Sequence, residues 1–392
     1  MHPVYLDHNA TTPIDPEVEE AMLPYLRGGL GGRFGNPSSS HEYGRQAHAA
    51  VDAARSQVAE LLGCASQEVV FTGCGSEADN LAVKGVAEAN RGQGNHIITS
   101  QIEHPAVLNT CRYLERHSYD VTYLPVDEYG LVDAAAVEAA ITERTILISI
   151  MHANNEVGTI EPIAAIGAIA RSRGIPFHTD AAQSVGKIPT KVDELGVDLL
   201  AVAGHKLYAP KGIGALYVRQ GTTLEPLIHG AGHEGSRRAG TENVAYIVAL
   251  GKACEIAGRT MSEYGPRVWE LRDRLYRLLC VGVEGLRLNG NPTQRLPNTL
   301  NVSFPGVDGE QLLAITPEVA ASTGSACHAG RTDPSAVLLA MGLSRQRALG
   351  AVRLSLGKFT SDTEIERAAT ALVSSYSELM GKASGTAQWL RK

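Results

Sequence analysis

The chain has 392 residues, 44% of them hydrophobic and 20% charged, which is enough to bury a sizeable core and predicts two or three folding units. Its 35 basic and 42 acidic residues give a net charge of −7, without a long basic run or an apolar run of about eighteen residues, so neither direct nucleic-acid binding nor a membrane partner is expected. The start carries no export signal and the cysteines form no CxxC pair, so we expect a cytoplasmic protein without a metal site.

Short apolar runs alternate with segments of helical period in the first part of the chain. The predicted strands are Val69 to Thr72, His96 to Ser100, Val121 to Leu124, Thr145 to Ile150, Pro176 to Thr179, Leu199 to Val202 and Ile213 to Val218. Helical patterns between them include Ala78 to Asn90, Ala106 to Arg116 and Ala164 to Arg173. This alternation predicts an α/β fold in which helices cover a mostly parallel sheet.

The pattern changes after about Ala257. A long helical stretch is followed by strand-like segments and a final helix: Ser262 to Leu279, around Leu286, Thr299 to Phe304, Val352 to Leu356 and Asp362 to Leu379. These segments predict a second, smaller α+β domain. No repeat or low-complexity linker separates the two parts, so we expect a broad interface with the functional site between the domains.

Two polar segments after strand-like runs carry the residues that pyridoxal phosphate chemistry requires. HTDAAQ (178–183) contains Asp180, and AGHKLYAPKG (203–212) contains Lys206. A lysine forms the Schiff base with the cofactor aldehyde, and a carboxylate pairs with the pyridine nitrogen so that the ring can accept electrons. Taken singly, Asp180 is equally well a helix cap and the lysine part of an exposed turn. Together, at strand ends where ligands of open α/β sheets bind, they favour a cofactor site.

A third segment, FTGCGSEADN (71–80), joins an apolar strand to a helix that is predicted to begin near Ser76. The turn includes Gly75, and unpaired N–H groups at the start of a helix suit a phosphate. Ser76 is alternatively a capping residue with Asp79 three positions on, and the two roles would coexist. Cys74 lies in the same turn, where it either fills space or lies close to the cofactor.

With these segments the chain resembles the class I, IscS/NifS-like cysteine desulfurases of the class-V aminotransferase superfamily. The resemblance extends from YLDHNATTP at Tyr5 to VRLSLGKFT, which ends at Thr360. Other matching segments are GNPSSSHEYGR (35–45), IEHPAV (102–107), MHANNEVGTIEP (151–162), HTDAAQSVGK (178–187), GHKLYAPKG (204–212), RRAGTEN (237–243) and STGSACHAG (322–330). The resemblance implies the type I fold of pyridoxal-phosphate transferases, with a seven-stranded sheet in a large domain of residues 15–257. Residues 1–14 and 258–392 would form the small domain, with a catalytic cysteine loop at about 322–334.

The resemblance also implies roles around the cofactor ring. Lys206 would be the Schiff-base lysine, His104 would stack on the ring and assist proton transfers, and Asp180 would hold the pyridine nitrogen. Gln183 and Asn155 would contact the side of the ring that carries the hydroxyl. Without the resemblance, His104 is more naturally a cap of the helix that follows Pro105.

The remaining implied contacts concern the phosphate and the substrate. The implied phosphate partners are Gly75, Ser76, His205 and Thr241, and Thr241 would reach the neighbouring subunit's site, which implies a homodimer. Arg353 would grip the substrate carboxylate, because a planar guanidinium matches a carboxylate with two hydrogen bonds. Asn36 and Asn155 would also contact the substrate.

Cys327 is the implied nucleophile. It lies in STGSACHAGRTDPS (322–335), a stretch of small, polar and glycine residues that predicts a loop. A mobile loop lets a thiolate reach the substrate sulfur and carry a persulfide outward. Cys111, Cys254 and Cys280 lie in helical patterns and fit the commoner role of small buried residues.

Ala203, His328 and the tail after Leu379 depart from the family pattern. Ala203 stands where these enzymes usually carry serine, so weaker retention of pyridoxal phosphate is expected. A histidinium at 328 would lower the pKa of the neighbouring thiol, although an exposed histidine without effect is an equal alternative. The tail differs from the one with which housekeeping relatives hold an iron–sulfur scaffold.

The implied reaction converts L-cysteine to L-alanine and holds the sulfur as a Cys327 persulfide for an acceptor protein. The pathway stays open between iron–sulfur cluster assembly and thiolation of tRNA or DNA. A selenocysteine lyase, favoured only by His328, is an alternative. Two alternatives come from other classes: an aminotransferase would not need Cys327, and a non-catalytic scaffold would be expected to have lost Lys206 or Cys327.

Overall fold

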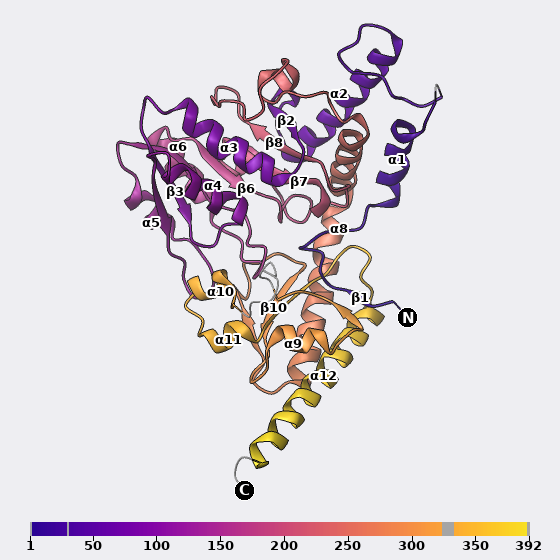
Figure 1. The fold of residues 1–392 in the computed structure, drawn as a ribbon, viewed down its shortest axis with the longest axis vertical. Coiled ribbons are helices and arrows are strands. Elements are labelled where there is room, and N and C mark those ends of the chain that lie inside the picture. Colours follow the sequence, from indigo (N-terminus) through magenta and orange to yellow (C-terminus); the bar gives the residue numbers. More distant parts are fainter. Residues whose placement is uncertain (1, 30, 324–332, 390–392) are drawn as a thin grey trace.

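A seven-stranded sheet forms the centre of the computed structural model, which describes residues 2–29, 31–323 and 333–381 and the backbone of 382–389. Its strands are β2 (Val69–Thr72), β3 (His96–Ser100), β4 (Asp120–Leu124), β5 (Thr145–Ser149), β6 (Phe177–Asp180), β7 (Leu199–Ala203) and β8 (Gly214–Val218). They lie in the order β2-β8-β7-β6-β5-β3-β4 (Figure 1), and only β8 runs in the direction opposite to the other strands. The predicted mostly parallel sheet is confirmed, and each strand end lies within one residue of its predicted place.

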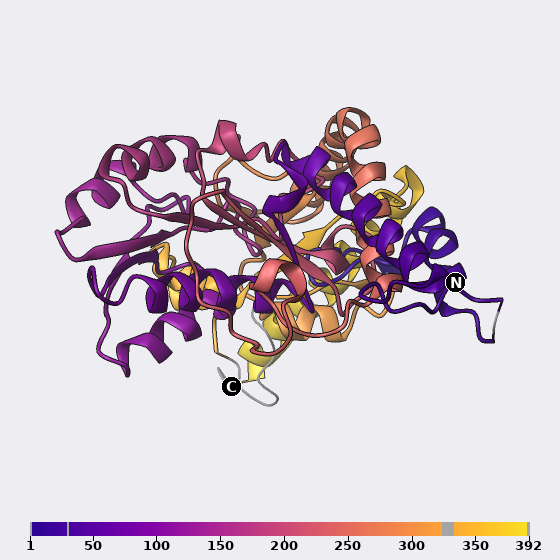
Figure 2. The ribbon, with the colours of Figure 1, turned by 90° about the horizontal axis from the view of Figure 1, so that it is seen from above.

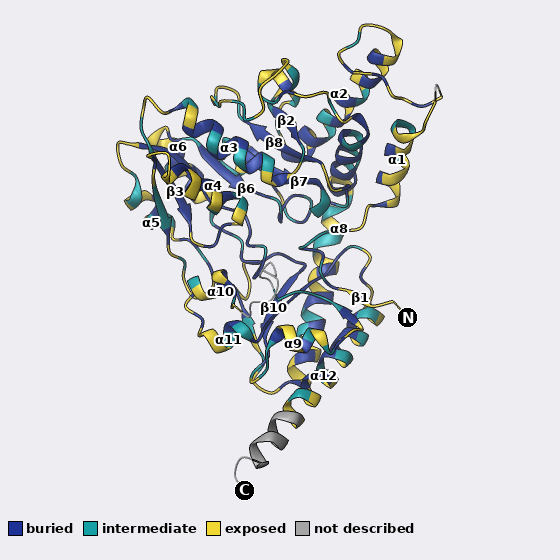
Figure 3. Cartoon of the chain, viewed as in Figure 1, coloured by how far each residue is buried: buried dark blue, intermediate teal, exposed yellow. Residues whose placement is uncertain are grey.

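Helices cover both faces of this sheet (Figure 2). On one face α3 (Gly75–Ala89) and α4 (Pro105–Glu115) pack against strand residues such as Leu147 and Leu216. On the other face lie α2 (Glu42–Leu62), α6 (Ile163–Arg173) and the first half of α8 (Val244–Gly282). The strands are therefore buried on both sides (Figure 3), which explains their continuous apolar sequences. The further helices here are α1 (Pro16–Leu26), α5 (Ala134–Ala140) and α7 (Val192–Leu195).

A second hydrophobic core lies below the large sheet in Figure 1. Its elements are β1 (Val4–Tyr5), β9 (Arg287–Asn289), β10 (Thr299–Ser303), α9 (Gly309–Ala314), β11 (Val319–Ala320), β12 (Ala351–Ser355) and α12 (Asp362–Trp389), together with the second half of α8. The short helices α10 (Ala336–Ala340) and α11 (Arg345–Leu349) pack in a separate, smaller cluster with Ile102, Met151 and Val157. β12, β10 and β9 form an antiparallel sheet, and β1 pairs in parallel with β11. Val4 and Leu6 are buried in this core, so the N-terminal residues pack with the C-terminal third of the chain.

Helix α8 begins earlier than the sequence predicts. It is one helix of 39 residues, capped by Asn243, and it extends from the first hydrophobic core into the second. Its first half packs on α2 through small residues: a Cβ atom on Gly251 would lie 2.6 Å from Cα of Ala54. Such residues give little hydrophobic pattern, so the predicted start at Ser262 was wrong. The predicted domain boundary at residue 257 falls inside this helix and stays a prediction.

None of the helices in the described part of the chain combines the length and the apolarity that a membrane span requires.

Candidate active site

A pocket of about 510 Å³ opens beyond the ends of β6 and β7, beside β12. It brings together most of the predicted site residues: Gly75, Ser76, His104, Asn155, Asp180, Gln183, His205, Lys206 and Arg353. β6 ends at Asp180, and β7 leads into the helical turn Gly204–Lys206. The expectation that both polar segments emerge at strand ends is confirmed.

Two predicted residues lie elsewhere. Thr241 lines a separate cavity of about 170 Å³ with Gly73 and Arg238. Asn36 is exposed, and its side chain accepts a hydrogen bond from the backbone N–H of Ser38 at 2.9 Å. The pocket of the single chain therefore lacks both residues. Cys327 and His328 lie outside the described residues.

The amine of Lys206 lies against the N-terminal segment. Its Nζ donates to the carbonyl oxygen of Ala10 at 2.9 Å and to that of Asn9. Burial, followed by the charge of Arg353, lowers the pKa of Lys206 to about 8, although Asp180 and Asp7 oppose the shift. A lysine with such a pKa is partly neutral near neutral pH, which is the state that attacks a carbonyl.

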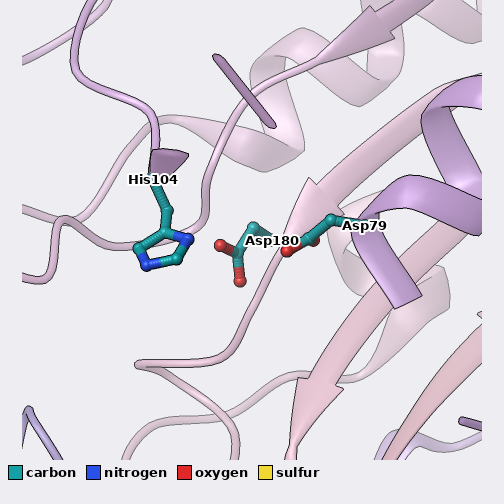
Figure 4. A group of neighbouring side chains, drawn as sticks. All are labelled: Asp79, His104 and Asp180. Carbon is teal, nitrogen blue, oxygen red and sulfur yellow. The ribbon is translucent and has the colours of Figure 1, made fainter. Parts of the chain in front are cut away.

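His104, Asp180 and Asp79 face one another across the pocket (Figure 4). The Nδ1 atom of His104 accepts the N–H of Ala106 at 3.2 Å, so this residue caps α4, as the alternative interpretation predicted. That bond places the proton of the neutral imidazole on Nε2 and leaves the ring in the pocket. Capping and contact with a cofactor ring are therefore compatible. Burial, then the charge of Lys206, lowers the pKa of His104 against the opposing effect of Asp180.

Asp79 is a pocket residue whose side chain the sequence suggested only as a partner in a helix cap. It is 2% exposed, and its Oδ1 has no hydrogen-bond partner among the described residues. Burial, then the negative charge of Asp180, raises its pKa well above the usual value. Asp180 accepts the N–H of Ala182 at 2.9 Å and remains directed at the pocket.

The start of α3 forms another wall of the pocket. The capping side chain is Cys74, whose Sγ lies 3.4 Å from the N–H of Glu77, so Ser76 is not the cap. Ser76 is exposed and lines the pocket, where the first N–H groups of the helix have no intrahelical acceptor. Ala203 packs beside this turn: a Cβ on Gly75 would lie 2.9 Å from its Cβ.

Arg353 lies at the opposite wall on β12. Its Nη2 donates to Asp7 at 2.8 Å and its Nη1 to the carbonyl oxygen of Asn155 at 3.0 Å, whereas its buried Nε has no described partner. The backbone N–H of Arg353 donates to Ser322 at 2.7 Å. The chain just before the segment that carries Cys327 is thereby held beside the pocket.

The N-terminal segment supplies functional groups that the sequence did not single out. Asn9 is 1% exposed, and its carbonyl oxygen accepts hydrogen bonds from Lys206 and Gln183. The Asp7 carboxylate accepts a hydrogen bond from Arg353. Both residues belong to YLDHNATTP. Membership of that motif was the only signal, because nothing local reveals which distant side chains they contact.

Residues 4–368 match the family model described as Aminotransferase class-V. Over 367 residues, the chain is 51% identical to a protein named cysteine desulfurase IscS from Pectobacterium carotovorum subsp. carotovorum, which covers 93% of this chain and 90% of the relative. The chain belongs to the cysteine desulfurase family. The solved structure of a NifS-like protein matches the structure of this cysteine desulfurase with a TM-score of 0.88 at 37% sequence identity. The match covers 97% of this chain and 99% of the NifS-like chain. SspA in complex with cysteine matches with a TM-score of 0.80 at 40% identity, covering 91% and 99%.

The cofactor of this cysteine desulfurase is pyridoxal phosphate, which the enzymes of its family use. The pocket residues fit that group. A reactive amine, an imidazole and a carboxylate surround a space for the ring, and the start of α3 offers N–H groups and the Ser76 hydroxyl to a phosphate. Asp79, His104 and Asp180 also offer ligand atoms within 4.8 Å of one another. We infer no metal site, because these atoms face the space that the ring requires.

The Ala203→Ser variant is expected to bind pyridoxal phosphate about 10- to 100-fold more tightly, since one hydrogen bond to a charged group contributes about 1.5–3 kcal/mol. Ala203 is buried, lines the pocket and lies next to Gly75, where a hydroxyl would face the phosphate. Titration of apo-protein with the cofactor measures the change. Ala201→Ser, on the same strand but within the sheet core, is the matched control. Equal affinity of the native and Ala203→Ser chains would contradict the prediction.

Proposed function

We propose that this chain removes the sulfur of L-cysteine, releases L-alanine and holds the sulfur as a persulfide on Cys327. One observation carries the proposal: a reactive lysine, an aspartate and a buried arginine share one pocket with Ser322, which lies just before the segment that carries Cys327. Ser322 pairs with Arg353 at one end, and at the other Ser335 donates to the buried carboxylate of Glu156 at 2.5 Å. The cysteine complex of SspA supports cysteine as the substrate.

Arg353 binds and orients the substrate carboxylate in this proposal. Arg353 is 5% exposed. Its Nη1 and Nη2 already donate hydrogen bonds, whereas its Nε has no hydrogen-bond partner among the residues that the structure describes. A carboxylate that approaches the fork competes with Asp7 for Nη2. Because Arg353 is held from both sides, the substrate amino group and Cα are directed toward Lys206.

Lys206 and His104 move the protons. Bound pyridoxal phosphate supplies an electrophilic carbonyl and a ring that accepts the electron pair of the broken Cα–H bond. The Nζ atom of Lys206, with its pKa near 8, takes the Cα proton and later returns it to Cα of the product. His104 exchanges protons at Nε2, the nitrogen that is not engaged in capping α4.

The sulfur step requires one thiolate. The Sγ of Cys327 attacks the Sγ of the substrate, the S–S bond forms, and the Cβ–S bond breaks. The carbon fragment keeps the electron pair of that bond, and Cβ receives a proton that replaces the one released when the Cys327 thiol became a thiolate. With the proton at Cα restored by Lys206, the product is L-alanine. Cys327 retains both sulfur atoms as a persulfide, so L-cysteine and one thiol become L-alanine and one persulfide without an external oxidant.

Two partners belong to the proposal. A sulfur-acceptor protein takes the outer sulfur of the persulfide, as the IscS relatives suggest. A second copy of the chain completes each site, because Thr241 lies away from the pocket of its own chain. The homodimer then brings Thr241 to the phosphate of the neighbouring site.

The test is the formation of L-alanine from L-cysteine by the native protein with pyridoxal phosphate and a reductant. We expect equal amounts of alanine and sulfide. The same assay with L-selenocysteine in place of L-cysteine tests whether the protein is a selenocysteine lyase. No alanine from L-cysteine, with rapid turnover of L-selenocysteine, would overturn the proposal in favour of a selenocysteine lyase. An amino acid consumed only with a keto-acid acceptor would indicate an aminotransferase.

Arg353→Lys is expected to raise KM for L-cysteine by about 10- to 100-fold, because a point charge cannot reproduce the two hydrogen bonds of the fork. The guanidinium also donates to Asp7 and to the carbonyl oxygen of Asn155. If the lysine preserves the shape of the pocket, kcat should fall by a smaller factor than the factor by which KM rises. Steady-state kinetics separate the two terms. Arg347→Lys, a half-buried arginine bonded to Asn289 away from the pocket, is the control. An unchanged KM in Arg353→Lys would remove Arg353 from substrate binding.

A further inference from the structure

Lys187 is a buried amine for which the proposed mechanism has no role. It is 4% exposed and lies in a series of hydrogen-bonded turns that follows β6. Its Nζ donates to Oε1 of Gln183 at 3.1 Å. Among the residues that the structure describes, no carboxylate pairs with it. Burying an unpaired amine is costly, so its retention calls for a local reason.

The charged groups that act on the Lys187 amine, Lys206 and Arg353, are both positive. Burial, followed by the positive charges of Lys206 and Arg353, lowers the pKa of Lys187 to about 7. A lysine introduced only to stabilise the fold would be expected to meet a carboxylate. Here the amine instead lies within electrostatic reach of Lys206 and Arg353, which both line the pocket.

The hydrogen bonds of Gln183 define its orientation. Its carboxamide has an oxygen and a nitrogen end of similar size, so a lone glutamine can rotate by half a turn. The amine of Lys187 donates to the oxygen end, and the carbonyl oxygen of Asn9 accepts from Nε2 at 3.0 Å. Both contacts select the same orientation. One N–H of Nε2 remains for the pocket that Gln183 lines.

The same carbonyl oxygen connects Gln183 to the reactive lysine. The carbonyl of Asn9 accepts from Lys206 Nζ as well as from Gln183 Nε2. Asn9 is itself held by hydrogen bonds from its side chain to Thr299 and to the carbonyl oxygen of Asn155. A continuous chain of contacts therefore runs from Lys187 through Gln183 and Asn9 to Lys206.

We propose that Lys187 is a positioning residue, which holds the Gln183 carboxamide with its N–H toward the pyridoxal phosphate ring and, through Asn9, orients the amine of Lys206. The inference rests on the proposed function, because it assigns Gln183 and Lys206 to the cofactor. Lys187 itself lies outside the pocket lining. It acts by removing the second orientation of the amide, which would present a carbonyl oxygen to the hydroxyl side of the ring.

The experiment compares Lys187→Met, Gln183→Ala and the double variant with the native protein. Apo-protein is titrated with pyridoxal phosphate, the absorption band of the bound cofactor is recorded, and thermal unfolding of the apo-protein is followed. We expect Lys187→Met to weaken cofactor binding about 10-fold and to shift the absorption band, as loss of one ordered hydrogen bond would do. In the Gln183→Ala background the same substitution should have little further effect, because its intermediary is gone.

Lys191→Met is the matched control, since that amine donates to the carbonyl oxygen of Glu60 far from the pocket. Unchanged cofactor affinity and absorption in Lys187→Met, or effects that add fully to those of Gln183→Ala, would overturn the inference. If Lys187→Met does not fold, Lys187→Leu takes its place, and failure of both would assign Lys187 to fold stability and also overturn it. A native protein that binds no pyridoxal phosphate would instead refute the proposed function.

Discussion

Lys206→Ala will lower the rate of L-alanine formation from L-cysteine by about 10⁴-fold or more. The variant loses the amine that joins the cofactor and the base that takes the Cα proton, and a positioned acid–base group alone contributes about 10²- to 10⁴-fold. The side chain makes its described polar contacts with the backbone carbonyl oxygens of Asn9 and Ala10. Its removal should therefore leave the fold intact, and the loss should appear in kcat.

The pH dependence of cofactor capture provides an independent readout for Lys206. Only the neutral amine reacts with the aldehyde, and burial lowers the pKa from 10.5 to about 8. At pH 7.5 about a quarter of such an amine is neutral, against about one part in a thousand at the ordinary pKa. Capture by the native apo-protein should become faster as pH rises, with a midpoint near 8. Lys211→Ala, an exposed lysine in the same segment, is the control and should behave as the native chain does. A midpoint above 10 in the native protein would contradict the prediction.

Cys327→Ala will abolish the formation of L-alanine and of protein persulfide while the protein still binds pyridoxal phosphate and L-cysteine. In the proposed step Cys327 is the only acceptor of the substrate sulfur, so its loss removes the bond that must form before the Cβ–S bond breaks. Cofactor binding should persist because the predicted ring and phosphate contacts come from other segments. The measurements are alanine release, persulfide labelling and the absorption change on adding L-cysteine.

Two exposed cysteines in the described part of the chain, Cys74 and Cys280, provide matched controls for Cys327. Cys74 lines the pocket, and its sulfur accepts the N–H of Glu77, so Cys74→Ser keeps a capping atom. Cys280 was expected to be buried, but it is exposed on α8. Cys74→Ser and Cys280→Ala should both retain most of the activity. Equal alanine from Cys327→Ala and the native chain would refute the nucleophile, and loss of persulfide in Cys74→Ser alone would transfer the role to Cys74.

The sequence determined the strands, the pocket edge and the main reactive groups of this protein. Apolar runs bounded by polar segments placed β3 and β7 to within a residue, because a strand buried on both faces leaves a continuous apolar pattern. Residue chemistry placed Asp180 and Lys206 at strand ends, since parallel strands bring their carboxyl ends to one edge.

Only the tertiary structure decided which residues far apart in the chain meet. Asn9 lies 197 positions before Lys206, and Asp7 lies 346 positions before Arg353, yet each pair is in hydrogen-bond contact. No local pattern encodes such a contact, because it depends on how the N-terminal segment packs in the second core. The same holds for Asp79, because its raised pKa results from burial in the folded chain. The hydrogen-bond partner of Lys187, Gln183, is near in sequence, but only packing explains why no described carboxylate pairs with this amine. Local periodicity thus determined the elements, whereas burial and long-range contacts determined the electrostatics of the site.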